Sequence, residues 1–292
     1  MILAAIDIGS NAARLQVSRV IIYSNETQFK KIEYLRFPLQ LGSDVFTLGF
    51  ISETKAEQFL KLMQIFKLLI EIYQVDDYMI CATSAMREAK NGQKIIKDIY
   101  QKTGLKIEII SGSREASLID KVIISKIGQE PVLHIDVGGG STELNLYTKG
   151  KKIATESFEI GSIRRLSIED SPKVWKSMEE WIKYNTKNLH GRLKAIGTGG
   201  NITKLYDLVG EKAEMKLSLR KIKEMRTMLN NNSFEDNMRF YNLNPDRADV
   251  IIPASDIYIN AMIWSKATSI LVPEIGLKDG IMQSLFEKVI RN

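Results

Sequence analysis

The sequence predicts an α/β protein made of two lobes, each built around a similar β-hairpin. Apolar runs with strand character alternate with segments of helical period. A ten-residue pattern occurs twice without gaps, as IDIGSNAARL at residues 6–15 and as IDVGGGSTEL at residues 135–144. In both copies an apolar strand ends at an aspartate, a turn rich in small residues follows, and a second strand begins. With 292 residues, the chain is long enough to bury one core in each lobe.

The first half of the chain alternates strands with helices. Its clearest helix begins near Thr54, which forms a capping-box pattern with Glu57. From Phe59 to Tyr73, apolar side chains then recur on one helical face. The expected strands are residues 2–8, 15–23, 78–82 and 105–110, and the expected helices are residues 54–75, a segment between the last two strands, and residues 114–127.

The second half repeats this scheme. Strands are expected on both sides of a glycine-rich turn, and segments of helical period follow them. The expected strands are residues 131–137, 143–147, 152–158 and 193–196, and the expected helices are residues 172–189, 202–209, 217–230, 254–270 and 278–291.

The composition narrows the kind of site that the chain can build. The net charge of +6 is a mild excess that tolerates anionic partners without selecting one. Cys81 is the only cysteine and there are two histidines, so an internal disulfide and a Cys/His zinc cluster are excluded. A bound metal must therefore sit on oxygen ligands, which favours magnesium, manganese or calcium. We expect a cytoplasmic protein, because the N-terminus shows no targeting signal and the apolar stretch 250–272 is interrupted by charged residues.

The two turns have the residue types that bind phosphate. Glycine lets backbone N–H groups converge on an anion because no Cβ atom intervenes. The aspartate at each strand end, Asp7 or Asp136, is placed to hold a divalent ion directly or through water. The copies differ where Arg14 of the first corresponds to Glu143 of the second, so one hairpin offers a cation and the other a further carboxylate. The expected phosphate-binding turn residues are Ser10 and Asn11 in the first copy and Gly138, Gly139, Gly140, Ser141 and Thr142 in the second.

Further short motifs accompany the hairpins, namely ATSAMREA at 82–89, ISGSREA at 110–116, GSIR at 161–164, GTGG at 197–200, RAD at 247–249 and GLKDG at 276–280. In this order, and nearly end to end, they resemble the exopolyphosphatase and guanosine pentaphosphate phosphatase (Ppx/GppA) family. The chain departs from the family at Ala12, where Ser is frequent, and at Asn201, where Thr is usual. It also has Lys278 and Asp279 where Arg-Glu is common, which removes a bidentate guanidinium.

The resemblance implies an actin-like fold, the ribonuclease H-like duplication shared by sugar kinases, Hsp70 chaperones and actin, with an interdomain cleft. This agrees with the internal repeat. In that fold the last helix crosses back to the first lobe, so we expect residues 1–125 and 278–292 to form lobe I and residues 126–277 to form lobe II. The chain resembles the short, two-domain form of the family.

The resemblance also implies roles for individual residues. Glu115 occupies the place of the family's catalytic glutamate and would orient or deprotonate the attacking water. Arg14 and Arg87 would bind phosphate oxygens, because a guanidinium fork matches their geometry. The expected metal ligands are Asp7, Asp136 and Glu143, and the expected phosphate-binding residues are Gly9, Ser10, Asn11, Arg14, Ser84, Arg87, Gly138, Gly139, Gly140, Ser141, Thr142, Gly197 and Gly199.

We therefore expect a metal-dependent hydrolase that cleaves terminal phosphoanhydride bonds with Mg²⁺, or with Mn²⁺ in its place. It would release orthophosphate from inorganic polyphosphate, convert guanosine pentaphosphate to tetraphosphate, or do both. We expect no DNA or membrane partner, and a homodimer is left open. Two alternatives are an actin-fold kinase or ATPase, and a non-catalytic sensor of polyphosphate or an alarmone. The set of carboxylates at the expected site argues against a pure sensor, because a protein that only binds a polyanion has little use for acidic side chains beside that ligand.

Overall fold

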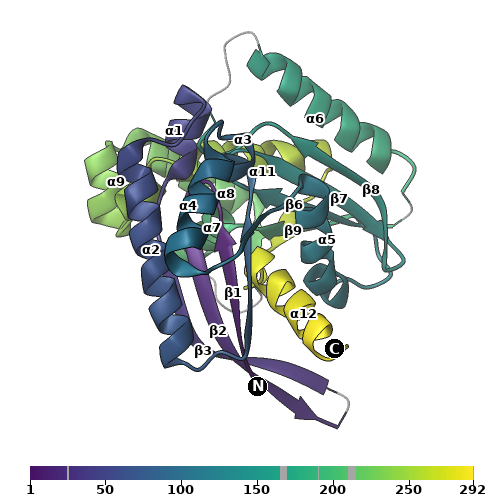
Figure 1. Ribbon diagram of the computed structural model, residues 1–292. Helices are drawn as coiled ribbons and strands as arrows, with labels where there is room; N and C mark the ends of the chain where they lie inside the picture. Colours follow the sequence, from purple (N-terminus) through teal and green to yellow (C-terminus); the bar gives the residue numbers. More distant parts are fainter. Residues whose placement is uncertain (25, 165–169, 190, 210–214, 292) are drawn as a thin grey trace. The chain divides into compact units, whose positions relative to one another are not determined.

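A computed structural model describes residues 1–24, 26–164, 170–189, 191–209 and 215–291 of the chain (Figure 1). The chain divides into two compact units. Unit 1 consists of Met1–Ile123 and Ile275–Asn292, and unit 2 consists of Ile124–Glu274. From the sequence we placed these boundaries at 125/126 and 277/278.

Unit 1 is a mixed sheet of strand order β3-β2-β1-β4-β5, in which β1 is antiparallel to β2 and parallel to β4. Its strands are β1 (Ile2–Ile8), β2 (Ala13–Tyr23), β3 (Glu26–Phe37), β4 (Asp77–Ala82) and β5 (Ile107–Ile109). Its helices are α1 (Leu41–Leu48), α2 (Glu53–Ile72), α3 (Ser84–Glu88), α4 (Gly92–Thr103), α5 (Gly112–Ile123) and α12 (Leu277–Val289).

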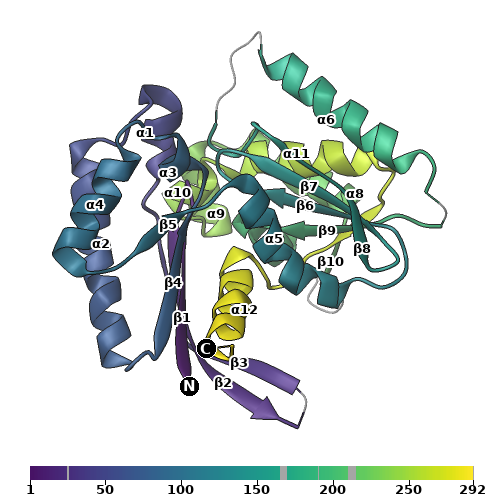
Figure 2. The ribbon, with the colours of Figure 1, turned by 45° about the vertical axis from the view of Figure 1, so that its right-hand side comes forward.

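Helices α2 and α4 cover one face of this sheet, and α12 lies on the other (Figure 2). The predicted amphipathic face of α2 is buried, with Phe59 and Phe66 packed against Ile6 of β1. The predicted capping box at Thr54 is wrong. The helix begins after Ser52, whose hydroxyl accepts a hydrogen bond from the Lys55 N–H at 3.4 Å. Strand β3 and helix α1 were not predicted, because β3 is an edge strand whose alternation is masked by its charged residues.

Helix α12 joins unit 1 although it follows unit 2 in the sequence. It packs on β1, β4 and α5. The approach to α5 is close because Gly280 has no side chain, and a Cβ atom there would overlap the carbonyl oxygen of Leu118. An ion pair between Lys121 of α5 and Glu287 of α12 adds to this contact. The return of the last helix to the first lobe was expected from the family resemblance.

Unit 2 is a mixed sheet of order β10-β11-β9-β6-β7-β8. Its strands are β6 (Val132–Val137), β7 (Thr142–Thr148), β8 (Lys151–Phe158), β9 (Lys194–Thr198), β10 (Lys216–Ser218) and β11 (Ser269–Leu271). Its helical segments are η1 (Ile124–Lys126), α6 (Asp170–Thr186), α7 (Gly200–Val209), α8 (Leu219–Asn231), α9 (Phe234–Tyr241), α10 (Pro245–Ala248) and α11 (Ile251–Trp264).

The two sheets share one topology. In each, a meander of antiparallel strands (β1-β2-β3 or β6-β7-β8) is followed by a strand parallel to its first member (β4 or β9). The predicted α/β class and its actin-like duplication are therefore confirmed. The predicted helix 254–270 is too long, because α11 ends at Trp264 and residues 269–271 form strand β11 beside β9. None of the helices in the described ranges is long and apolar enough to cross a membrane.

Candidate active site

The two hairpins pair in the same register. Asp7 lies opposite Arg14 across β1 and β2, and Asp136 lies opposite Glu143 across β6 and β7. Directly opposed residues of an antiparallel pair project from the same face of the sheet. The turns also close alike, because the Gly9 N–H donates to the Ala12 carbonyl at 3.1 Å and the Gly138 N–H donates to the Ser141 carbonyl at 2.9 Å. The repeat seen in the sequence is thus a repeat of backbone geometry.

In unit 1, the segment after β3 holds the carbonyl groups of the first turn. The Gly42 N–H donates to the Ser10 carbonyl, and the Gln40 N–H donates to the Asn11 carbonyl, both at 2.8 Å. Gly42 permits this approach, because a Cβ atom there would lie 2.9 Å from the Cβ of Ser10. The segment therefore fixes which way the peptide groups of the turn face.

In unit 2, the segment after β8 does the same. The N–H groups of Ile163 and Arg164 donate to the Gly139 carbonyl at 2.8 and 3.0 Å, and the Nε of Arg164 donates to the Gly140 carbonyl at 2.6 Å. Gly161 allows the contact, because a Cβ atom there would overlap the Gly139 carbonyl. A segment that follows the third strand thus braces each turn.

This bracing has a consequence for anion binding. Within the described parts of the chain, the N–H groups of Ser10 and Gly139 have no backbone acceptor. These two residues occupy the same place in the repeat. Since the carbonyl groups of both turns are held by neighbouring segments, the N–H groups are left to meet an anion, as in other backbone anion sites.

Unit 1 adds charged and hydroxyl groups to its turn. Nη1 of Arg14 donates to Oδ2 of Asp7 at 2.8 Å. Burial raises the pKa of the Asp7 carboxyl, while Arg14 and Lys278 oppose that rise. The hydroxyl oxygens of Ser10 and Ser84 lie 2.9 Å apart, so the start of α3 meets the first turn.

Glu115 lies in the first turn of α5, at the same end of the sheet. The helix start is stabilised by Ser111, whose hydroxyl accepts from the Arg114 N–H at 3.1 Å. The side chain of Arg87 donates to the Ile110 carbonyl at 2.8 Å, which joins α3 to the loop leading into α5. The motifs at 82–89 and 110–116 are therefore brought together in unit 1.

The environment of Cys81 shows how densely charged this region is. The thiol is buried in β4, beside Asp7 of β1. Burial raises the pKa of the Cys81 thiol to about 12, and the carboxylates of Glu108, Asp7 and Glu115 add to the rise while Arg114 opposes it. Glu115 and Asp7 thus lie within electrostatic range of the same buried sulfur atom.

Unit 2 gathers carboxylates where unit 1 has the Asp7–Arg14 ion pair. Glu143 is buried, and its Oε1 accepts hydrogen bonds from Ser141 at 2.6 Å and Ser157 at 3.0 Å. Asp136 is partly buried at the next strand over. Gly199, with φ +106°, packs against this strand end, where a Cβ atom would lie 2.9 Å from the Val137 carbonyl oxygen and 3.3 Å from Oδ1 of Asp136.

Asp136 and Glu143 fit a magnesium site whose remaining ligands are waters and phosphate oxygens of a substrate. The described residues contain no cluster of three or more His, Cys, Asp or Glu side chains able to hold a metal by themselves. Mg²⁺ keeps several waters and is usually bound through one or two carboxylates plus phosphate oxygens of a substrate. Asp136 and Glu143 match that pattern better than Asp7, whose carboxylate is engaged by Arg14.

The loop after β9 is held by a buried polar network. Nε2 of His134 lies 2.9 Å from the Thr198 hydroxyl, and its Nδ1 lies 3.3 Å from Nδ2 of Asn145. Tyr258 donates its hydroxyl to the Thr198 carbonyl. Burial raises the pKa of Tyr258 well above its ordinary value, so the hydroxyl stays a donor. The network positions Gly199 beside the second turn. Gly197, which was predicted to bind phosphate, is buried in β9, where a Cβ atom would meet Ile270 and Ile202. His134 is thus a buried residue of the core.

The sequence did not identify the bracing residues. Gly42 and Gln40 follow an edge strand that was not predicted, so their place could not be inferred. The side chain of Arg164 is 14% exposed and bonded to the turn, which its place in the GSIR motif alone did not reveal. A glycine shortly after the third strand of each meander was the available signal.

Two units that repeat one sheet topology and one braced hairpin define an α/β protein of the duplicated, actin-like class. The profile of the Ppx/GppA phosphatase family matches residues 20–289, and the chain belongs to this family. It is 31% identical, over 316 aligned residues, to the bifunctional 3-dehydroquinate synthase/phosphatase of Fusobacterium nucleatum subsp. nucleatum. That match covers 98% of this chain and 46% of the relative, so the chain spans about half the length of that protein.

Solved structures show the same fold. An exopolyphosphatase from Cytophaga hutchinsonii superposes with a TM-score of 0.85 at 22% identity, covering 99% of this chain and 98% of that one. A Ppx/GppA family member from Aquifex aeolicus superposes with a TM-score of 0.75 at 22% identity, covering 100% of this chain and 99% of that one. Family membership supports a phosphatase activity in general.

Proposed function

We propose that this chain hydrolyses terminal phosphoanhydride bonds, and that its substrate is inorganic polyphosphate, guanosine pentaphosphate or both. The observation that carries the proposal is the pair of hairpins in identical register, each with a braced turn that presents N–H groups. One hairpin adds an arginine and the other a second carboxylate. A polyanion that also needs a cation for its chemistry suits such a pair of complementary hairpins.

The proposed roles follow from the chemistry that the reaction needs. Hydrolysis of a phosphoanhydride requires charge neutralisation at the phosphoryl group, a positioned water and a stabilised leaving group. Backbone N–H groups of the turns, with Arg14 and Arg87, bind phosphate oxygens. Glu115 holds the attacking water and accepts its proton. Asp7 keeps Arg14 in place through the ion pair described above.

Asp136 and Glu143 would hold Mg²⁺, or Mn²⁺, which would neutralise charge on the phosphate oxygens when bound. The hydroxyls of Ser141 and Ser157 orient Glu143 by donating to one of its oxygens. We propose that Asp7 orients Arg14 and does not bind the metal.

The test measures orthophosphate release in the presence of magnesium, from long-chain polyphosphate and separately from guanosine pentaphosphate. Glu115→Gln keeps the side-chain shape but removes the base, and we expect it to lower the rate about 10²- to 10⁴-fold, the usual contribution of a general base. Glu108→Gln is the matched control, an exposed glutamate of the neighbouring strand, and should retain the native rate.

A native rate in Glu115→Gln would overturn the role of Glu115. Absence of release from both substrates by the native protein, with tight binding retained, would replace the hydrolase with a sensor. Transfer of phosphate from ATP to an acceptor would favour the kinase alternative.

A further inference from the structure

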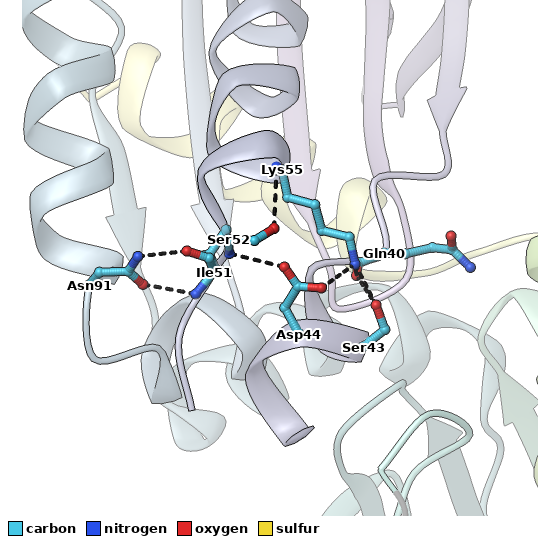
Figure 3. A network of polar contacts seen from close by, with 7 residues as sticks. All are labelled: Gln40, Ser43, Asp44, Ile51, Ser52, Lys55 and Asn91. Carbon is cyan, nitrogen blue, oxygen red and sulfur yellow. Dashed lines mark hydrogen bonds and ion pairs between the residues drawn. The ribbon is translucent and has the colours of Figure 1, made fainter. Parts of the chain in front are cut away.

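Lys55 belongs to a polar network that links the segment after β3 to the start of α2 (Figure 3). Its ammonium group donates to the Gln40 carbonyl at 2.6 Å and to the hydroxyl of Ser43, and it pairs with Oδ1 of Asp44 at 2.7 Å. The side chains of Lys55 and Asp44 are 19% and 14% exposed. Both side chains are therefore largely shielded from solvent, unlike those of a surface ion pair.

The network holds an unfavourable backbone conformation. Gln40 has φ 51° and ψ 41°, the left-handed region that is unfavourable for a residue with a Cβ atom. Such strain persists only where the surroundings fix it, and it clusters at functional sites. Besides Lys55, the N–H and hydroxyl groups of Ser43 donate to the Gln40 carbonyl at 3.2 and 2.9 Å.

That conformation is what aims the segment at the turn. The Gln40 N–H reaches the Asn11 carbonyl, and two residues later the Gly42 N–H reaches the Ser10 carbonyl. If Gln40 relaxed, both donors would move away, and the peptide groups of Ser10 and Asn11 would be free to rotate. The contacts therefore run from the Lys55 ammonium to the turn through a single segment of backbone.

The network also reaches the second element at the turn. The other oxygen of Asp44 accepts from the Ser52 N–H at 3.0 Å. The side chain of Asn91 exchanges two hydrogen bonds with the backbone of Ile51, at 2.9 and 2.7 Å (Figure 3). Asn91 begins α4, which directly follows the α3 segment that carries Ser84. The start of α2 is thereby tied both to the segment behind Ser10 and to the segment behind Ser84.

We propose that Lys55 is a positioning residue for phosphate binding: it acts through Gln40 and Gly42 to hold the N–H groups of the Ser10–Asn11 turn toward the anion. The assignment rests on the proposed function for its ligand, but the positioning itself is a property of the free protein. Lys55 does not touch the turn.

The experiment compares Lys55→Met, which keeps the length of the side chain, with Lys55→Arg and with the control Lys61→Met. Lys61 is an exposed lysine of the same helix. Amide hydrogen exchange is followed in residues 8–16 and 38–46, with 136–144 and 277–289 as internal references. Calorimetry with tripolyphosphate and steady-state kinetics are measured on the same proteins.

We expect Lys55→Met to accelerate exchange in 8–16 and 38–46 and to leave both reference segments unchanged. Tripolyphosphate binding should weaken about 10- to 100-fold, the range typical for loss of a residue that orients binding groups from behind. The loss should appear mainly in KM and less in kcat, because Glu115 is held by other contacts. Lys55→Arg, which keeps a donor and a charge, should restore part of the exchange protection, and Lys61→Met should match the native protein.

Equal exchange and equal affinity in Lys55→Met and Lys61→Met would overturn the proposal. A rise in exchange across the whole of unit 1, including 277–289, would also overturn it, since it would mean a general loss of stability. If Lys55→Met does not fold, Ser43→Ala and Asp44→Asn test the same segment with smaller changes, and unchanged exchange in both would be decisive against it. Failure of the native protein to bind tripolyphosphate would overturn the proposed function, and the exchange comparison would still decide the role of Lys55.

Discussion

The hairpins of the two units have the same backbone geometry, and they differ in the side chains that surround it. In unit 1, Asp7 pairs with Arg14 at 2.8 Å. In unit 2, the position that corresponds to Arg14 holds Glu143, which accepts hydrogen bonds from two serines. The bracing differs as well. Arg164 reaches the second turn directly, whereas Lys55 acts on the first turn through an intervening segment. The two copies therefore have equal turn geometry, and they differ in the sign of the charge opposite the aspartate.

The largest difference is expected from the bracing glycines. Gly161→Ala would press a Cβ atom into the Gly139 backbone. Gly42→Ala would meet the ring of Phe46 at 2.8 Å and the Cβ of Ser10 at 2.9 Å, and of these the ring can turn aside. Overpacking of this kind costs about 1–3 kcal/mol, and we expect Gly161→Ala to lie at the upper end and Gly42→Ala at the lower. Urea unfolding with tripolyphosphate calorimetry measures both effects. Gly128→Ala is the control, because a Cβ atom there meets open space. The comparison breaks if Gly42→Ala proves the more damaging.

A smaller effect is expected from Arg164→Gln. The change removes the donor to the Gly140 carbonyl, and we expect a loss of about 1.5 kcal/mol, the lower end of what a hydrogen bond from a charged group contributes. Because the backbone donors of Ile163 and Arg164 remain, we expect faster amide exchange in residues 138–141 and weaker phosphate binding, with the first turn unaffected. Lys176→Gln, from an exposed pair in α6, serves as the control. Exchange at 138–141 equal to that of the control would show that Arg164 does not hold the turn.

The smallest effect is a pH dependence confined to unit 1. Burial alone would raise the pKa of Asp44. Hydrogen bonds from Lys55 and Ser52 nevertheless hold this pKa below its ordinary value of 3.8. A depressed carboxyl pKa stabilises the fold above the ordinary value, and this contribution disappears as the pH falls through the native value. The difference in unfolding free energy between the native protein and Asp44→Asn, about 1 kcal/mol for such bonds, should be constant near neutrality and shrink below pH 3.8.

Urea unfolding at several pH values measures that difference, with Asp98→Asn, an exposed aspartate of α4, as the reference. A difference that grew on acidification would contradict the assignment. In unit 2, Arg164 pairs with Glu159 at 3.9 Å, and Glu159 is 82% exposed, so we expect a weaker change at the second turn.

The sequence predicted the parts of the fold that carry a strong local signal. Buried strands β1 and β6 end at an aspartate and a turn of small residues, and this pattern is readable because a period of two and a glycine both have direct structural causes. Strand β3 was missed because it lies at a sheet edge and its exposed face is charged. Most of the short strand β11 fell within a predicted helix, since so short a segment fits either period.

For the candidate site, the residues on the hairpins were predicted and their supports were not. Arg14 and Glu143 stand out because they occupy one position of a repeat. Lys55 and Gln40 act through backbone carbonyl and N–H groups, which any residue possesses, so nothing in their identity marks them. Contacts of this kind depend on three-dimensional proximity and leave little trace in residue type.

Helix α12 has a consequence for the order in which the protein is made. Unit 2 is one continuous stretch of chain, whereas the sheet of unit 1 keeps the face that carries Leu3 and Ala5 uncovered until α12 has been synthesised and Gly280 seats against α5. Domains form largely as units while the chain leaves the ribosome. The middle of the chain can therefore reach its native core first, and the segment that contains Glu115 waits for the last helix before its surroundings are complete.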